Sequence, residues 1–311
     1  MNITFRQLQI FIRLAELRSI SAVARACHVT QPTVSMQLKE MTDTIGIPLY
    51  EVIGKKLYLT KAGEELARTA RNLAHEWGSF EQQIAAMKGL TEGSLRVAVV
   101  STAKYFIPRM LGDFCREFPE IDIALEVQNR DGVVDRLRNN LDDIYIMSTP
   151  PRDIDVVKQI FLPNPLVVVA PLQHPLAGKK RLQFAQLLNE RFILRERGSG
   201  TRLACEHYFS ENKFTPLVRL ELGSNEAIKQ AVAADMGLTI LSRHALGDHL
   251  TDQNLTVLDV QDFPIMSNWY IVHLQGKRLS PIASNFLGYL SQHAQDKVEK
   301  SDQGKITSPE C

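Results

Sequence analysis

The stretch that decides the fold is SISAVARACHVTQPTVSMQLKEMT, residues 19–42. Two short helical patterns flank a tight break at residues 27–30, and no acidic residue occurs from position 20 to 39. Thr30 is a favourable N-cap for the second helix, and Pro32 stands in its first turn, where the missing N–H leaves no hydrogen bond unmade. The pattern predicts a helix-turn-helix whose second helix enters the major groove of DNA. The alternative is a helical hairpin inside an ordinary domain.

The following segment predicts a wing. Residues 51–60, EVIGKKLYLT, indicate a small hairpin with a Gly-Lys-Lys tip, and residues 2–17 indicate a first helix that packs across the helix pair. We therefore expect an all-α winged helix-turn-helix DNA-binding domain over residues 1–61. Glutamine suits adenine edges and methionine a thymine methyl, whereas lysines position the domain on phosphates or remain solvated surface charges. The residues expected to contact DNA are Gln31, Pro32, Thr33, Ser35, Met36, Gln37, Lys39, Lys55 and Lys56.

This domain resembles the DNA-binding domain of the LysR-type transcriptional regulators. The similarity covers residues 1–65 and rests on Phe5, Leu8, Phe11, Ala15, Ser19, Ala22, Ala24, residues 30–35 (TQPTVS), Gln37, Leu38, Gly46, Pro48, Leu49, Leu59, Thr60, Ala62 and Gly63. Val52 stands where relatives often carry a DNA-contacting Arg, and Met36 where many carry a basic residue. The resemblance implies a transcription regulator whose partner is double-stranded DNA.

Composition and charge fit a nucleic-acid reader attached to a larger body. The chain has 311 residues, which is enough for two or three domains, and a net charge of +1. Residues 1–61 carry eight Lys/Arg and four Asp/Glu, whereas the other 250 residues carry a net charge of −3. A basic N-terminal domain (the head, residues 1–61) joined to a mildly acidic remainder of the chain indicates that the head binds nucleic acid.

Cysteine usage and hydropathy favour a cytoplasmic location. Cys27, Cys115, Cys205 and Cys311 lack CxxC or zinc-ligand spacing, which predicts reduced thiols and no metal site; a redox sensor is the alternative. Arg6 and Gln7 stand before any apolar run, so we expect no signal peptide at the N-terminus. The most apolar run, residues 166–172, is far too short to cross a bilayer.

Residues 62–90 predict a long helix that joins two chains. Its apolar residues recur at alternating spacings of four and three, a period of about 3.5 residues that is typical of a two-stranded coil. The alternative is an amphipathic helix that lies on its own chain. The family resemblance supports a linker helix that forms a homodimer, and such dimers can pair into a tetramer. The predicted seam is Leu66, Ala70, Leu73, Trp77, Phe80, Ile84 and Met87.

After a boundary at residues 89–93 (GLTEG), strands and helices alternate, which implies an α/β domain over residues 93–300. This order resembles the effector-binding domain of the same family, a two-lobed, periplasmic-binding-protein-like fold. The resemblance implies lobe I at 94–162 and 268–300, lobe II at 163–267, two crossover strands, and a ligand in the cleft. Residues 301–311 are expected to be a disordered tail. We expect strands at 94–100, 121–128, 144–147, 155–161, 166–170, 192–194, 219–222, 239–241 and 269–273, and helices at 108–118, 132–139, 182–188, 202–212, 225–234 and 281–293.

Polar and cationic residues follow the strands, where open α/β sheets bind their ligands. The main turns are 101–104 (STAK), 196–202 (ERGSGTR) and 223–226 (GSNE). Hydroxyls, helix N-termini and guanidinium groups suit phosphate or carboxylate. Each turn could equally be an ordinary helix cap. The candidate effector-binding residues are Ser101, Thr102, Lys104, Asn129, Thr149, Arg197, Ser199, Gly200, Thr201, Arg202 and Asn225.

Residues 31–39, 99–109 and 198–202 are similar to the LysR-type regulators of the Rubisco (Calvin-cycle) operons. This resemblance implies control of carbon-fixation genes by a small anionic effector, a phosphorylated sugar or nucleotide. Residues 147–151 (MSTPP) depart from it, because they lack the Gly-Arg pair often found there, and Asp235 stands where Gly is usual.

Three other functions stay open: a LysR-type regulator of another pathway with a carboxylate or other effector, an enzyme with a DNA-binding appendage, and an architectural DNA protein. No Walker loop, HExxH motif or nucleophile elbow occurs in the sequence. We therefore expect no catalytic residue, no cofactor and no membrane partner. RNA polymerase is a further candidate partner of a regulator.

Overall fold

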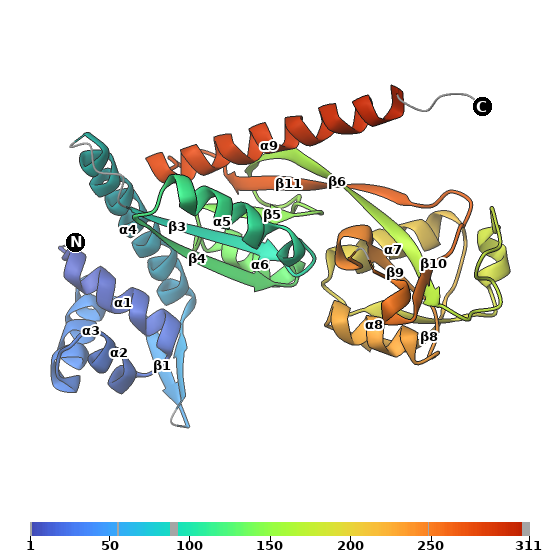
Figure 1. Cartoon of the computed structure of the whole chain (residues 1–311). Helices are drawn as coiled ribbons and strands as arrows, with labels where there is room; N and C mark the ends of the chain where they lie inside the picture. Colours follow the sequence, from blue (N-terminus) through green and yellow to red (C-terminus); the bar gives the residue numbers. More distant parts are fainter. Residues whose placement is uncertain (1, 55, 88–92, 248, 307–311) are drawn as a thin grey trace. The chain divides into compact units, whose positions relative to one another are not determined.

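The computed structural model describes residues 2–54, 56–87, 93–247 and 249–306 (Figure 1). The chain divides into two compact units: Met1–Lys88 with Asn139–Leu141, and Gly89–Arg138 with Asp142–Cys311. Residues 89–92 of the predicted boundary lie outside the described part of the chain. Each unit encloses its own hydrophobic core.

Three short helices form the core of the first unit. Helix α1 (Phe5–Leu17) begins with a capping box at Thr4, and α2 (Ile20–Ala26) is capped by the Ser19 side chain. His28, in the turn before α3 (Gln31–Ile45), has a φ of +54°. One apolar stripe of each helix faces the shared core, as amphipathic helices require. The fully buried side chains include Phe11, Leu14, Val23, Val34, Leu38 and Met41. The helix-turn-helix prediction is therefore confirmed.

The wing and the long helix are joined by a close backbone contact. Strands β1 (Tyr50–Ile53) and β2 (Lys56–Leu59) pair antiparallel, and α4 (Lys61–Met87) follows at once. A Cβ on Gly63 would lie 1.9 Å from the carbonyl oxygen of Leu49, so the first turn of α4 can pack against the wing only without a side chain at this position.

Lobe I of the second unit is a mixed sheet covered by helices. Strand β3 (Gly93–Val100) pairs in parallel with β4 (Ile121–Gln128) and β5 (Ile144–Met147). Strand β5 also pairs antiparallel with one of the two long strands that connect the lobes. The ring centroids of Phe114 and Phe286 lie 5.0 Å apart within its core. The covering helices are η1 (Ala103–Tyr105), α5 (Ile107–Glu117), α6 (Arg130–Arg138) and α9 (Pro281–Ile306).

Two long antiparallel strands connect the lobes. Strands β6 (Val156–Pro171) and β11 (Ile265–Leu274) pair along ten residues with one register shift at Trp269, and they run through both lobes (Figure 1). Lobe II adds strands β7 (Arg191–Arg195), β8 (Leu217–Leu222), β9 (Thr239–Ser242) and β10 (Leu255–Val257), helices α7 (Gly200–Glu211) and α8 (Asn225–Ala233), and short helices η2 (Phe184–Leu187), η3 (Arg243–Ala245) and η4 (Thr251–Gln253).

The two-lobed α/β prediction is confirmed, but three details differ. The strands predicted at 155–161 and 166–170 are one strand, β6, because the backbone stays extended and paired with β11 through Pro163 and Pro165. Strand β10 was not predicted, since three residues are too few for a strand pattern. Helix α9 continues to Ile306, so residues 301–306 are helical rather than disordered. No proline follows Pro281 before position 309 to stop this helix. Residues 307–311 lie outside the described residues.

None of the helices in the described ranges combines the length and apolar character that crossing a membrane requires. The same ranges contain no group of three or more His, Cys, Asp or Glu side chains placed to hold a metal ion.

Candidate functional site

Local caps fix the start of α3, the helix that carries most of the predicted DNA contacts. The Thr30 hydroxyl accepts a hydrogen bond from the backbone N–H of Thr33 at 3.4 Å and lies 2.8 Å from the Thr33 hydroxyl. Pro32 stands in the first turn, as predicted. Because Val34, Leu38 and Met41 are fully buried, the opposite side of α3 is left at the surface.

Five of the nine predicted DNA contacts are exposed. Gln31, Pro32, Met36 and Lys39 are exposed, and Lys56 is exposed on β2. Thr33, Ser35 and Gln37 are half-buried on α3, and Lys55 lies outside the described residues. Their roles at a DNA surface remain predictions.

The predicted seam of α4 leaves large apolar side chains in contact with solvent. Leu73, Trp77 and Phe80 are 49%, 51% and 51% exposed, whereas Ala70 is buried. The rings of Trp77 and Phe80 lie 5.7 Å apart, so two of these side chains form one aromatic pair. The Trp77 ring also lies 5.9 Å from the ring of Phe5 on α1. Neighbouring large apolar side chains that are half exposed are typical of a protein–protein contact surface.

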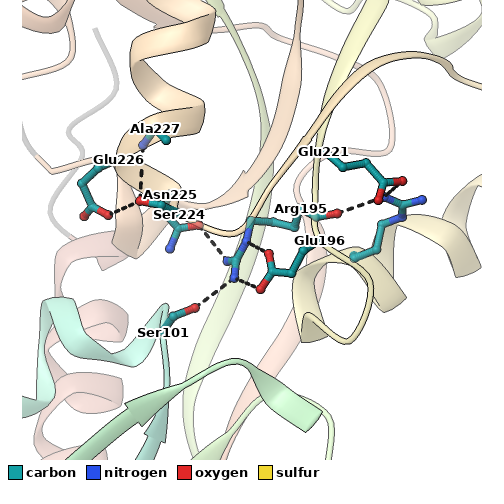
Figure 2. Close-up of polar contacts among 9 residues, drawn as sticks. Ser101, Arg195, Glu196, Glu221, Ser224, Asn225, Glu226 and Ala227 are labelled. Carbon is teal, nitrogen blue, oxygen red and sulfur yellow. Dashed lines mark hydrogen bonds and ion pairs between the residues drawn. The ribbon is translucent and has the colours of Figure 1, made fainter. Parts of the chain in front are cut away.

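A buried arginine that the sequence did not single out lies at the centre of the effector domain's polar site (Figure 2). Arg195, the last residue of β7, is 3% exposed. Its guanidinium donates to both carboxylate oxygens of Glu196, at 2.7 and 2.9 Å, and to Asn225 Oδ1 at 2.8 Å. It also donates to Ser101 Oγ of lobe I at 3.0 Å, so this side chain bridges the two lobes.

A second bridge between the lobes forms around Glu226, at the start of α8. Lys104 Nζ lies 3.0 Å from its Oε2, and the hydroxyl of Tyr105 donates to its Oε1. Burial raises the pKa of the Glu226 carboxyl, but these two hydrogen bonds outweigh burial and hold the pKa at about 2. Burial, followed by the bond to Glu226, raises the pKa of the Tyr105 hydroxyl. Glu226 is thus ionised, and Tyr105 protonated, at neutral pH.

Arg202 is held by protein groups of its own lobe. Its guanidinium donates to Glu206 Oε1 at 2.7 Å, to Glu221 Oε1 at 3.0 Å and to the backbone carbonyl of Arg195 at 2.9 Å. The geometry therefore favours Arg202 as a brace for the end of β7 over a direct effector contact. Arg197 is exposed in the loop between these two arginines.

The glycine loop before α7 approaches lobe I closely. Gly198 has a φ of +85°, and its carbonyl accepts a hydrogen bond from the N–H of Asp131 at 3.2 Å. A Cβ on Gly200 would lie 2.9 Å from Ser148 Oγ and 3.5 Å from Thr149 Oγ1, so glycine permits this contact. The predicted residues Ser199 and Thr201 are buried beside it.

The other predicted residues have different neighbours. Asn129 Oδ1 accepts from the N–H of Gly132 at 3.0 Å and so caps α6, which is the ordinary reading of this residue type. The carbonyl of Thr149 accepts from Arg130 Nε at 2.8 Å, and Thr102 is buried before η1. Of the predicted set, the structure therefore brings Ser101, Lys104 and Asn225 around Arg195 and Glu226.

The described cysteines differ in exposure. Cys205 is buried on α7, and burial raises the pKa of its thiol to about 12, which keeps the thiol protonated at neutral pH. Cys27 and Cys115 are half-buried, and Cys311 lies outside the described residues.

Comparisons with known proteins identify both units. Residues 5–64 match the model "Bacterial regulatory helix-turn-helix protein, lysR family", and residues 88–295 match the LysR substrate binding domain. The chain is 44% identical to the HTH-type transcriptional activator CmpR of Synechocystis sp. over 94% of its length and 96% of the relative. It is 45% identical to a RuBisCO operon transcriptional regulator of Acidithiobacillus ferrooxidans over 92% of this chain and 93% of that one.

Solved structures agree with the fold. The regulatory domain of Synechocystis CcmR, in complex with 2-PG, superposes with a TM-score of 0.64 at 50% identity, over 65% of this chain and 98% of that one. A full-length OxyR variant from Pseudomonas aeruginosa superposes with a TM-score of 0.75 at 22% identity, over 95% of each chain. Because the family models cover both units and the relatives span almost the whole chain, this protein belongs to the LysR family of DNA-binding transcriptional regulators.

Proposed function

We propose that this regulator controls carbon-fixation genes and that a small phosphorylated metabolite, bound between the lobes, changes how it binds DNA. The observation that carries the proposal is the 50% identity of its effector domain with the CcmR domain in complex with 2-phosphoglycolate (2-PG). The RuBisCO operon regulators of Acidithiobacillus ferrooxidans and Allochromatium vinosum, 45% and 40% identical, support the same pathway.

The chemistry of the cleft is suited to such an effector. Arg195 and Lys104 supply positive charge, and the hydroxyls of Ser101 and Tyr105 supply neutral donors. Guanidinium groups and helix N-termini are the usual partners of phosphate in proteins. Two lobes that meet through these groups give a ligand the means to favour one arrangement of the lobes over another.

The apolar stripe of α4 supports a homodimer. Leu73, Trp77 and Phe80 leave a strip of apolar surface that a second copy of α4 would cover. A symmetric dimer presents two DNA-binding domains to the two half-sites of an operator. Pairing of two dimers would give a tetramer. In this proposal the protein acts in the cytoplasm as a regulator and catalyses no reaction.

The target genes can be tested with the full-length protein and fragmented genomic DNA of its source organism. Fragments retained by the protein, with and without 2-phosphoglycolate, are sequenced. The proposal predicts enrichment of promoters of carbon-fixation genes and a change in the retained set when the metabolite is present. Enrichment of promoters from an unrelated pathway, with no response to 2-phosphoglycolate, would replace this function with that of a regulator of another pathway.

Turnover is tested separately. The protein is incubated for several hours with 2-phosphoglycolate and related phosphorylated sugars, and the remaining metabolites are then quantified by mass spectrometry. The proposal predicts full recovery of each compound. Stoichiometric excess of any product over protein would identify an enzyme with a DNA-binding appendage.

A further inference from the structure

The carboxylate of Glu226 lies among hydrogen-bond donors that are typical of an anion site. Its Oε2 lies 3.0 Å from Lys104 Nζ and 3.2 Å from Ser224 Oγ, and its Oε1 accepts from the Tyr105 hydroxyl. Ser224 and Glu226 stand at the N-terminus of α8, where free backbone N–H groups favour negative charge. Lys104 and Tyr105 belong to lobe I. Donors from both lobes therefore meet at one side chain of the protein itself.

Positive charge surrounds the same ring and carboxylate. The ammonium groups of Lys104 and Lys229 lie 5.3 and 5.6 Å from the ring centroid of Tyr105. The Glu226 side chain is 48% exposed and the Lys104 side chain 37%, so this bridge can open without disturbing the core. A small anion that replaced Glu226 would find these cations already in place.

Asn225 connects the same cluster to the buried arginine. It is 2% exposed, and its Oδ1 accepts a hydrogen bond from Arg195. Figure 2 shows Asn225 between Arg195 and Glu226. A hydrogen bond from the Asn225 side chain to the Tyr105 hydroxyl partly offsets the rise in the pKa of that hydroxyl. An anion that displaced Glu226 would therefore meet the Arg195–Asn225 pair beside Lys104 and Tyr105.

We propose that Glu226 is an internal competitor of the effector: its carboxylate holds Lys104, Tyr105 and the N-terminus of α8 in the free protein, and the anionic group of the effector displaces it. This inference rests on the proposed function and specifies how that site is regulated. Glu226 thereby raises the effector concentration at which the cleft fills. It also disfavours weakly charged ligands, because a ligand must interact with these donors more strongly than the carboxylate that it displaces.

Titration calorimetry of the full-length chain tests the inference with two probes, 2-phosphoglycolate and inorganic phosphate. Glu226→Gln keeps the size of the side chain and removes its charge, so Lys104 and Tyr105 lose their anionic partner. We expect both probes to bind the variant about fivefold more tightly than wild type, the change that corresponds to losing an ion pair of this exposure. Glu211→Gln is the matched control, since it removes the same charge from an exposed position on α7 and should leave affinity unchanged.

The outcomes separate the inference from the proposed function. If wild type binds 2-phosphoglycolate and Glu226→Gln binds it equally or more weakly, the inference is wrong and the effector class stands. If 2-phosphoglycolate does not bind but phosphate binds the variant more tightly than wild type, Glu226 is a competitor and the effector is a different anion. If neither probe binds either protein, both ideas are overturned.

Two further variants isolate the mechanism. In a Lys104→Met background the gain from Glu226→Gln should shrink, because Glu226 then competes only for Tyr105 and the N-terminus of α8. Glu226→Asp retains the charge but is one methylene too short to keep both contacts, so it should also bind the probes more tightly. An unchanged gain in the Lys104→Met background would contradict the displacement of Glu226 from Lys104.

Discussion

The DNA-binding head and the effector cleft between the two lobes differ in how their functional side chains are held in place. On α3 the polar residues project from one helix and need no distant partner, since local caps at Thr30 and Pro32 set their positions. In the cleft the charged side chains are paired: Lys104 of lobe I with Glu226 of lobe II, and Arg195 with Glu196. Removing a side chain from the head should therefore cost DNA binding alone. Removing one from the cleft should also leave a charged partner unsatisfied and cost stability.

The largest effect is expected for Arg195→Ala. Loss of this buried guanidinium leaves Glu196 and Asn225 Oδ1 without their donor, which should lower the free energy of unfolding of the effector domain by about 3 kcal/mol. Urea denaturation of the full chain measures this change. The exposed neighbour Arg197→Ala is the control and should change stability by less than about 0.5 kcal/mol. If the two variants lower the free energy of unfolding equally, the charged groups of the cleft are no more important for stability than an exposed arginine.

The next effect concerns the surface that α4 exposes. Trp77→Ala removes the largest apolar side chain of the stripe and should weaken dimerisation about 30-fold, or about 2 kcal/mol. Analytical ultracentrifugation over a concentration series measures the dimer dissociation constant. Glu76→Ala, the polar neighbour on the same helix, should leave it unchanged. A dimer that is indifferent to Trp77 would place the interface elsewhere.

Two head variants should separate base reading from phosphate contact. Gln31→Ala should cost about 1–3 kcal/mol of affinity for the preferred operator and little for random DNA. Lys56→Ala should weaken both DNAs alike and reduce the slope of log affinity against log salt by about 1. Fluorescence anisotropy at several salt concentrations measures both. Neither variant should change thermal unfolding; if either does, its side chain also supports the fold of the head.

The smallest effect is a pH dependence from Glu226. Its pKa is about 2 in the folded protein and 4.5 ordinarily, so its stabilising contribution is complete above pH 4.5 and is lost as the pH falls towards 2. The unfolding midpoint of wild type should exceed that of Glu226→Gln at neutral pH, and the difference should shrink through this window. Because the side chain is half-exposed, the difference should be small. A difference that is constant with pH would contradict an ionised bridge.

The sequence predicted the head well because its signals are local. The Thr30 cap, the proline in the first turn and the buried positions of α3 all follow from residues within a few positions of one another. The same holds for β3 and β5, whose apolar runs match buried strands, and for β4, whose alternating sequence matches a strand with one exposed face. The break predicted within β6 was wrong, since pairing with β11 keeps Pro163 and Pro165 in an extended strand.

The cleft was predicted only in part because its contacts are long-range. Ser101, Lys104 and Asn225 were singled out from strand-to-helix turns, and all three lie around one site. Arg195 was overlooked, since an arginine at the end of an apolar strand carries no local motif, and its partner Ser101 is 94 residues away. The acidic residue Glu226 was also overlooked as a functional side chain, because a search for anion-binding groups passes over carboxylates.

Regulation by an effector requires that ligand binding between the lobes changes how the DNA-binding head holds DNA. The decisive measurement is a nuclease footprint of the full-length protein on its own operator, taken without ligand and with saturating 2-phosphoglycolate, for wild type and Arg195→Ala. We expect the ligand to change the bases that wild type protects and to leave the footprint of the variant unaltered. Identical wild-type footprints with and without a ligand that calorimetry shows to be bound would contradict this expectation.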